Sequence, residues 1–272
     1  RPPRSTLSSS SAASDVYKRQ AIHFAYGHFR QWPAIGQVFS NADYNILSSL
    51  QAGESNYGVM GNPDVKPETT IQYEIGYKQS LGPDVGADVT VFYKDIRDLL
   101  GVEFVETYNG AEYARLTNVD FGSVLGFTIS LDHRRLGPLS LSLDYTWQQG
   151  LGNASNPRET AIRAAAQEDP RPRLVPFDWD QRHTFNLTAA LDRPGDYGIS
   201  AVLRAGSGQP YTPVIDSGFN AGLVTNSGRK PAGMTLDLRA EKSVRLFGRE
   251  ASLFTRVFNA LDTRYFLSLI HI

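Results

Sequence analysis

Several features that are common in proteins are missing from this chain of 272 residues. It contains no cysteine, which excludes disulfide bonds and thiolate metal sites within it. It contains no run of about 18 apolar residues, so no membrane-spanning helix is predicted. An excess of one charge is also missing, because 27 Lys and Arg stand against 28 Asp and Glu, giving a net charge of −1. We therefore predict no nucleic-acid partner, because such a partner calls for a basic patch.

What the chain does contain is alternation of apolar and polar residues, which is typical of strands with one apolar face. The clearest case is Leu139–Trp147, where odd positions are apolar and even positions are Ser, Asp or Thr. No long window has the helical period, and only 159–167 is predicted to form a short helix. About nine strands are predicted, long enough to cross a membrane at a tilt. They lie near residues 21–30, 68–80, 86–104, 113–133, 138–149, 180–192, 196–206, 233–246 and 249–258.

The connections between these strands alternate strictly between short and long. The short ones carry Gly, Pro or both, as tight turns require, at 80–85, 134–137, 193–195 and 247–248. The long ones are 31–67, 105–112, 150–179 and 207–232. A meander that crosses a membrane has this pattern, with tight turns on one rim and long external loops on the other. The predicted fold class is all-β, an antiparallel meander that forms part of a transmembrane β-barrel and is incomplete in this stretch.

Aromatic residues gather near the ends of the predicted strands. A girdle of aromatic side chains at the lipid–water interface would place them there. The alternative is the ordinary preference of aromatic residues for strands. The residues concerned are Tyr26, Phe29, Trp32, Tyr145, Trp147, Phe177, Trp179, Tyr197 and Tyr211.

Both ends of the chain are predicted to come from sequencing adapters. Codons for Asp15–Gln20 can be written so that their reverse complement encodes Leu267–Ile272. This pair resembles the transposase end sequence used in tagmentation libraries. We therefore assign 1–20, which we expect to be disordered, and 267–272 to translated adapter, and take 21–266 as the biological part. The alternative for the first segment is a genuine Ser-rich tail.

A more specific pattern lies at Gly61–Thr70, which reads GNPDVKPETT and directly precedes an alternating strand. Its two prolines prevent a helix and favour an extended approach to the strand. The element resembles the Asn-Pro-x-Leu-Lys-Pro-Glu entry to a barrel strand in TonB-dependent outer-membrane receptors, although Val65 stands where that family usually has Leu. The residues that match this structural motif are Asn62, Pro63, Lys66, Pro67 and Glu68.

Further segments resemble the C-terminal half of the same receptors, most closely the Oar-like branch that carries a carboxypeptidase-regulatory-like domain. They are Ala25–Phe29, Val91–Leu99, Asp178–His183, Gly206–Tyr211 and Phe258–Asp262. The resemblance implies a roughly 22-stranded barrel around an N-terminal plug, in the outer membrane of a Gram-negative bacterium. It also implies that the plug, the first half of the wall and the closing strand are missing here. Expressed alone, this stretch is expected to aggregate and not to function, because unpaired strand edges are costly in lipid.

The function implied by the resemblance is that of a receptor that binds a scarce nutrient and takes it up across the outer membrane. The implied partners are outer-membrane lipid, the missing plug and N-terminal strands, a TonB-type energy-coupling complex and an unknown small ligand. We predict no cofactor, metal site, catalytic residue or enzymatic activity. The alternatives are an adhesion or structural role and a hydrolase carried on a barrel.

Candidate ligand contacts are aromatic residues in or beside the long loops, where they could stack on a sugar, peptide or chelate; girdle or loop packing is the alternative for each. They are Trp32, Tyr57, Trp179 and Tyr211. The densest polar cluster is Asp178–His183, where Asp178, Asp180 and His183 are possible metal ligands. Adjacent residues of a strand point to opposite faces, so His183 and Asp180 would not converge easily on one ion. Loop anchoring is predicted instead, with Arg182 pairing to a carboxylate across strands.

Overall fold

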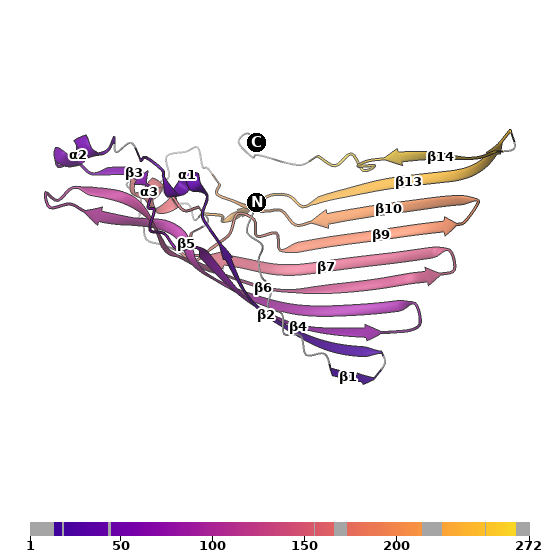
Figure 1. The fold of residues 1–272 in the computed structure, drawn as a ribbon. Coiled ribbons are helices and arrows are strands. Elements are labelled where there is room, and N and C mark those ends of the chain that lie inside the picture. The colour runs from indigo at the N-terminus through magenta and orange to yellow at the C-terminus, as the bar shows by residue number, and fades with distance from the viewer. Residues whose placement is uncertain are drawn as a thin grey trace.

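The computed structural model describes residues 14–17, 19–42, 45–154, 156–165, 173–213, 225–247 and 249–264. Their long strands form one curved antiparallel sheet that follows the chain as a meander and is open at both sides (Figure 1). Neighbouring strands on the main path through this sheet follow one another in chain order.

The strands on this path differ in length, and the remaining elements are short. The path consists of β1 (Ser14–Tyr17), β2 (Gln20–Gln31), β4 (Glu68–Ser80), β5 (Val85–Glu106), β6 (Glu112–Leu136), β7 (Leu139–Gly152), β9 (His183–Arg193), β10 (Tyr197–Gly206), β13 (Gly233–Leu246) and β14 (Arg249–Val257). The other elements are α1 (Ile35–Val38), α2 (Leu47–Gln51), β3 (Asn56–Met60), α3 (Glu159–Ala165), β8 (Val175–Pro176), β11 (Pro210–Tyr211) and β12 (Gly228–Arg229).

The register of the sheet places side chains of one kind next to one another. Leu131 of β6 pairs with Leu143 of β7, and the same row continues through Leu187, Leu203 and Leu236. Because side chains alternate along a strand, all these leucines lie on one face. We call it the apolar face.

The opposite face of the sheet, the polar face, carries cross-strand hydrogen bonds. The Ser130 hydroxyl donates to Asp144 Oδ1 at 2.6 Å, and the Ser142 hydroxyl donates to Asp132 Oδ1 at 2.7 Å. Each pair joins β6 to β7. A sheet that is apolar on one side and hydrogen-bonded on the other suits a wall between lipid and water.

Aromatic rings stack across strands on the apolar face. Tyr73 lies 5.2 Å from Tyr26 and 6.5 Å from Tyr93 between ring centroids, so three strands contribute to one row. Two residues beyond Tyr93, this face becomes charged, because Asp95 pairs with Arg97 at 2.5 Å. A charged pair on the apolar face is costly in hydrocarbon, so the lipid-compatible band ends near this pair.

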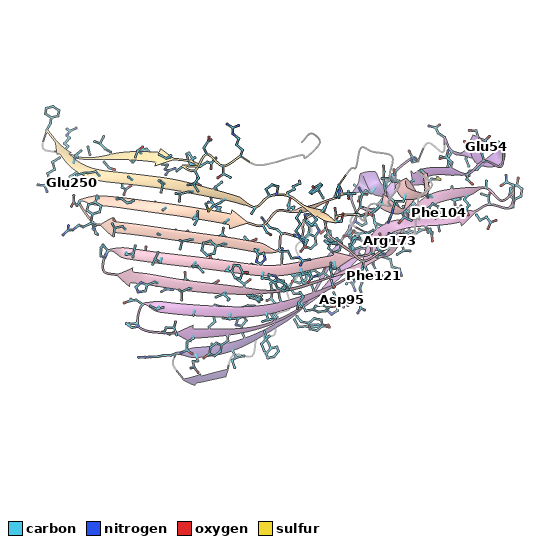
Figure 2. All side chains as sticks on the ribbon, turned by 180° about the vertical axis from the view of Figure 1, so that it is seen from behind. Glu54, Asp95, Phe104, Phe121, Arg173 and Glu250 are labelled. Carbon is cyan, nitrogen blue, oxygen red and sulfur yellow. The ribbon has the colours of Figure 1, made fainter. Side chains whose placement is uncertain are left out.

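The two clusters of buried apolar side chains that occur in the described residues lie beyond the lipid-compatible band. Beyond the charged pair, β5 and β6 continue as a hairpin, and β3 runs parallel to β6 there. Residues 35–60, 99–118 and 156–165 together form a unit that we call the cap, at the far end of the molecule from the short turns (Figure 1). Figure 2 marks these two ends by Glu54 in the cap and Glu250 beside a short turn. The cap buries Ile46, Leu50, Val59, Val102, Ala111, Ala114, Leu116 and Ala161.

The predicted strands are confirmed. Each of the nine predicted segments corresponds to one of the nine long strands, and the short connections fall between β4 and β5, β6 and β7, β9 and β10, and β13 and β14. The helix predicted at 159–167 is α3. The elements that the sequence did not predict are β1, near the N-terminus, and α1, α2, β3, β8, β11 and β12, which lie within long loops. None of the helices in the described ranges is long and apolar enough to cross a membrane.

The N-terminal segment that we assigned to adapter was expected to be disordered, and this is wrong for Ser14–Tyr17, which form the strand β1. Ser14–Tyr17 pairs with the edge of β2, where Ser14 lies opposite Ile22 and Tyr17 opposite Gln20. The C-terminal segment 267–272 lies outside the described residues, as do 1–13. The origin of these segments is a property of the DNA and stays a prediction.

Candidate functional site

The Asn-Pro motif forms the entry to β4 and is clamped by one asparagine. Asn62 Oδ1 accepts a hydrogen bond from the Asp64 backbone at 3.0 Å, which makes a local turn. Asn118 then binds Lys66 in both directions: its Oδ1 accepts from the Lys66 N–H at 2.7 Å and its Nδ2 donates to the Lys66 carbonyl at 3.0 Å. The same Nδ2 donates to the Asp98 carbonyl at 2.7 Å, beside an irregularity in the β5–β6 pairing.

The two prolines of the motif keep this entry extended. Pro63 follows Asn62 within the turn, and Pro67 directly precedes Glu68, the first residue of β4. The Glu68 carboxylate accepts a hydrogen bond from the backbone of Leu100, a residue buried in β5. The motif therefore fixes the start of a barrel strand to the base of the cap.

A buried carboxylate joins two long loops to the sheet. Asp180 is fully buried, and its Oδ1 accepts from the Gly150 N–H of β7 at 2.9 Å. Its Oδ2 accepts from Arg182 Nε at 2.9 Å and from Arg229 Nη2 at 2.6 Å. Arg229 Nη1 also donates to the Asp180 carbonyl at 2.9 Å and to the Gly208 carbonyl at 3.3 Å. A charge this deeply buried is tolerated because two guanidinium groups surround it.

The segment Asp178–His183 anchors a loop as predicted, but Arg182 pairs with a different carboxylate from the one expected. Arg182 pairs with Asp180, two residues before it, and not with a carboxylate on a neighbouring strand. The contact between loops comes from Arg229 of β12, which is 49 residues along the chain from Asp180. No period in the sequence points to such a distant partner.

Two stacked aromatic rings lie beside this carboxylate, on the polar face. Phe177 and Trp179 lie 5.0 Å apart with an angle of 11° between their planes. Phe177 is 5% exposed and sits over Gly122 and Gly152, which pair with each other across β6 and β7. A Cβ on either glycine would lie 2.4 Å from the Phe177 ring, so only glycine leaves room for it. The glycine pair thus makes a slot that holds the loop against the sheet.

Further hydrogen bonds connect three of the long loops to one another. Arg158 Nη2 donates to the Ser40 hydroxyl at 2.7 Å, which joins loop 150–179 to loop 31–67. Asn226 Nδ2 donates to the Pro176 carbonyl at 2.8 Å, which joins loop 207–232 to loop 150–179. Thr225 adds a hydrogen bond to Glu159 at the start of α3. The cap and the Asp180 cluster are therefore parts of one connected outer surface.

A buried carboxyl group sits at the base of the cap, beyond the charged pair that ends the lipid-compatible band. Asp120 is 6% exposed, and its Oδ1 accepts from Asn153 Nδ2 at 2.8 Å. Burial raises the pKa of the Asp120 carboxyl from 3.8 to about 6, and the hydrogen bond from Asn153 opposes this only in part. Near neutral pH this group titrates where an ordinary aspartate would stay ionised.

The four candidate ligand contacts lie at different places on the outer surface. Trp32 follows β2 directly and is 67% exposed, whereas Trp179 is 43% exposed and stacks on Phe177. Tyr211 lies in β11, whose partner β12 contains Arg229, so Trp179 and Tyr211 belong to the same loop cluster. The backbone of Tyr57 lies in β3 within the cap, and its side chain is outside the described set. Their role as ligand contacts stays a prediction.

The cluster Asp178–His183 has no metal-binding arrangement in the structure. Asp180 is occupied by two arginines, and His183 Nδ1 shares a hydrogen bond of 2.8 Å with the Tyr145 hydroxyl on the apolar face. No group of three or more His, Cys, Asp or Glu able to hold a metal occurs in the described part of the chain. Ser207 Oγ accepts from the His183 backbone N–H at 3.0 Å, which is an anchoring contact and not a nucleophile–base pair.

Comparison with known proteins gives a consistent set of matches. A family profile described as "TonB dependent receptor-like, beta-barrel" matches residues 12–260. No match was found among curated protein sequences.

Solved outer-membrane proteins share the fold. The outer membrane transporter YddB from Escherichia coli has a TM-score of 0.63 at 12% identity, over 92% of this chain and 36% of that one. A mutant of the ferric enterobactin receptor PfeA from Pseudomonas aeruginosa has a TM-score of 0.63 at 19% identity, over 95% and 35%. The siderophore receptor PirA from Acinetobacter baumannii has 0.59 at 16%, over 93% and 36%. The chain thus spans about a third of the length of these structures.

Proposed function

The chain belongs to the TonB-dependent receptor β-barrel family, and on that premise we propose that it forms part of the wall of an outer-membrane receptor that imports a scarce nutrient. In this proposal the ligand binds passively to the outer surface, and a plug inside the barrel then moves under force from a TonB-type energy-coupling complex. No covalent step, cofactor or resident metal is assigned to the chain.

The single observation that carries this proposal is that the sheet has one apolar and one polar face, while the cap and the Asp180 cluster lie together at one end of it. The row from Leu131 to Leu236 faces one way, and the Ser130–Asp144 and Ser142–Asp132 hydrogen bonds lie on the other side. In the outer membrane, the apolar face contacts lipid and the polar face lines the barrel interior. The cap and the Asp180 cluster then face the exterior, where the ligand arrives.

We also propose a division of the chain, which rests on the sequence of its two ends, and a set of partners, which follows from the receptor function. Residues 21–266 form the partial barrel, and 1–20 and 267–272 are adapter-derived. The partners are outer-membrane lipid, the plug and N-terminal wall of the same protein, the energy-coupling complex and one small ligand. The aromatic residues Trp32, Tyr57, Trp179 and Tyr211 are the proposed ligand contacts.

Uptake by cells that carry the full-length gene tests this function. The solved relatives are described as ferric enterobactin and siderophore receptors and a copper transporter, so iron chelates and copper are the first cargoes to test. We expect deletion of the gene to abolish high-affinity accumulation of one such cargo, and a protonophore to abolish it in cells with the intact gene. Accumulation that is unchanged by deletion for every nutrient tested, together with lost surface attachment, would instead establish the adhesion alternative.

A further inference from the structure

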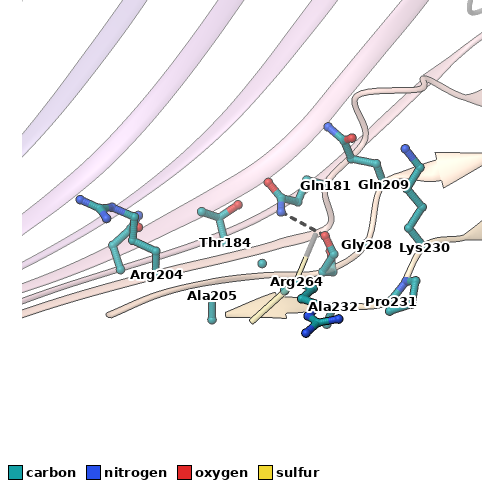
Figure 3. A pocket seen from close by; sticks show the side chains of 14 residues that line it. Gln181, Thr184, Arg204, Ala205, Gly208, Gln209, Lys230, Pro231, Ala232 and Arg264 are labelled. Atoms are coloured by element: carbon teal, nitrogen blue, oxygen red, sulfur yellow. Dashed lines mark hydrogen bonds between the residues drawn. The ribbon is translucent and has the colours of Figure 1, made fainter. Parts of the chain in front are cut away.

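A cavity of about 370 Å³ opens on the polar face, where β9 begins, β10 ends and β13 begins (Figure 3). Residues of β9 and β10, the segments next to these strands, the segment before β13 and one residue after β14 line it, so it brings together residues that are distant in sequence. Its polar lining includes six side chains that can donate hydrogen bonds: Gln181, Thr184, Asn186, Arg204, Lys230 and Arg264. A volume near the low end of the range for ligand pockets suits one charged head group.

The rim of this cavity is fixed in place by the structure around it. The Gln181 side chain donates to the Ser207 carbonyl at 3.0 Å, and the Lys230 N–H donates to the Gln209 carbonyl at 2.9 Å. The backbone packs so closely that a Cβ on Gly208 would lie 1.5 Å from the Lys230 carbonyl oxygen. Arg229 of the Asp180 cluster also holds the Gly208 carbonyl. The backbone that carries the rim residues, and the Gln181 side chain, are therefore in place before any ligand arrives.

The charge of the cavity is positive. Arg204 is neutralised, because its Nη1 lies 2.9 Å from Asp237 Oδ2. The Lys230 and Arg264 side chains form no ion pair with any carboxylate among the residues that the structure describes. No Asp or Glu lines the cavity. Two cations without a counter-charge, placed around a preformed space, attract an anion.

We propose that this cavity binds an anionic group, a carboxylate or phosphate, of the ligand that the receptor imports. The inference rests on the proposed function and adds the charge of the substrate to it. Lys230 supplies a compact positive charge, and Arg264 supplies a planar fork that matches two oxygens of the anion. Thr184 and Asn186 are two residues apart in β9, so they lie on the same face of the strand, and they offer hydrogen bonds to the remaining oxygens.

Calorimetric titration of the purified full-length receptor in detergent, with inorganic phosphate and separately with citrate, tests the proposal. We expect saturable binding of at least one probe at low ionic strength. Loss of one charged hydrogen bond typically weakens binding by about tenfold or more, so Lys230→Gln and Arg264→Gln should each do so. Lys94→Gln is the matched control, because Lys94 is on the polar face of β5 and does not line the cavity. Its affinity should equal that of the wild type.

Two outcomes overturn the proposal. Absence of saturable binding, or equal affinity in all variants, shows that the cavity takes no soluble anion. If the probes fail to bind and Lys230→Gln lowers the melting temperature of the ligand-free receptor, then a carboxylate of the protein itself, such as one on the plug, occupies the cavity. The titration needs no energised transport, so anion binding can hold while uptake fails, and the two proposals are tested separately.

Discussion

The sheet and the cap use the same amino acids in opposite ways. On the sheet, large apolar side chains are exposed, such as Phe24 at 61% and Tyr73 at 49%. In the cap, Leu116 is 1% exposed and Ala111 is fully buried. The cap therefore folds as a water-soluble protein does, by removing apolar surface from water. The sheet contains no comparable core in its described part, and its apolar face needs lipid as a solvent while its strands satisfy one another's backbone groups.

The largest expected effect lies where two of the long loops are fixed to the sheet. Asp180→Ala leaves Arg182 and Arg229 without their shared carboxylate, so we expect loop stability to fall by about 3–5 kcal/mol. Hydrogen–deuterium exchange of the full-length receptor should show faster exchange in 207–232. Asp196→Ala is the control, because its pair with Lys242 is solvent-exposed and should contribute only about 0–1 kcal/mol. Equal exchange in both variants would contradict a structural role for the Asp180 cluster.

A core substitution should affect the cap alone. Leu116→Ala removes a side chain that packs with Val102 and Ala161, and it should destabilise the cap by about 2–5 kcal/mol. Limited proteolysis of the full-length receptor should then cut within 35–60 or 99–118 and leave the membrane-embedded strands intact. Leu131→Ala, on the apolar face, is the comparison and should leave the cap as resistant as in the wild type. Cleavage spread equally over sheet and cap would show that the two regions unfold together.

A charge introduced into the sheet should lower the stability of the receptor much more on the apolar face than on the polar face. Leu143→Arg places a cation on the apolar face near the middle of β7, where we expect a cost of about 2–4 kcal/mol. Ser142→Arg is the adjacent residue on the polar face and should cost far less. Urea unfolding of the full-length receptor in lipid vesicles measures both. If Ser142→Arg proves as damaging as Leu143→Arg, the assignment of the two faces is wrong.

The smallest expected effect is a pH dependence at the base of the cap. In the folded protein, the pKa of Asp120 is raised to about 6 from its ordinary 3.8. The folded state therefore binds the proton more tightly, and stability should fall as pH rises through the window between these values. Asp120→Asn keeps the shape and removes the titration, so its melting temperature should vary less between pH 4 and 7 than that of the wild type. If the melting temperatures of the wild type and Asp120→Asn vary with pH in the same way, another group is responsible for the pH dependence.

The sequence predicts the wall well because each strand is a local pattern. The alternation in Leu139–Trp147 is sufficient to place β7, and the Gly and Pro residues of the short connections are sufficient to place the turns. The resemblance of Gly61–Thr70 to a strand entry then points to the correct family. Each of these signals lies within about ten residues of chain.

The outer surface is less predictable, because its contacts are non-local. The Asp178–His183 run stands out as the densest polar cluster, yet its decisive partner, Arg229, lies in a different loop. The parallel pairing of β3 with β6 likewise depends on the cap core and not on a period within β3. The apolar residues Ile46, Leu50 and Val59 in a predicted loop were the available signal that this loop packs against something.

The most direct test of the division between sheet and cap is the accessibility of spin labels along β7. This stretch has no cysteine of its own, so a single cysteine introduced at one of the positions 139–147 is the one labelling site within it. In membranes, we predict that labels at odd positions collide preferentially with oxygen dissolved in lipid, and labels at even positions do not. Accessibility that shows no alternation, or that alternates with the opposite phase, would contradict the account.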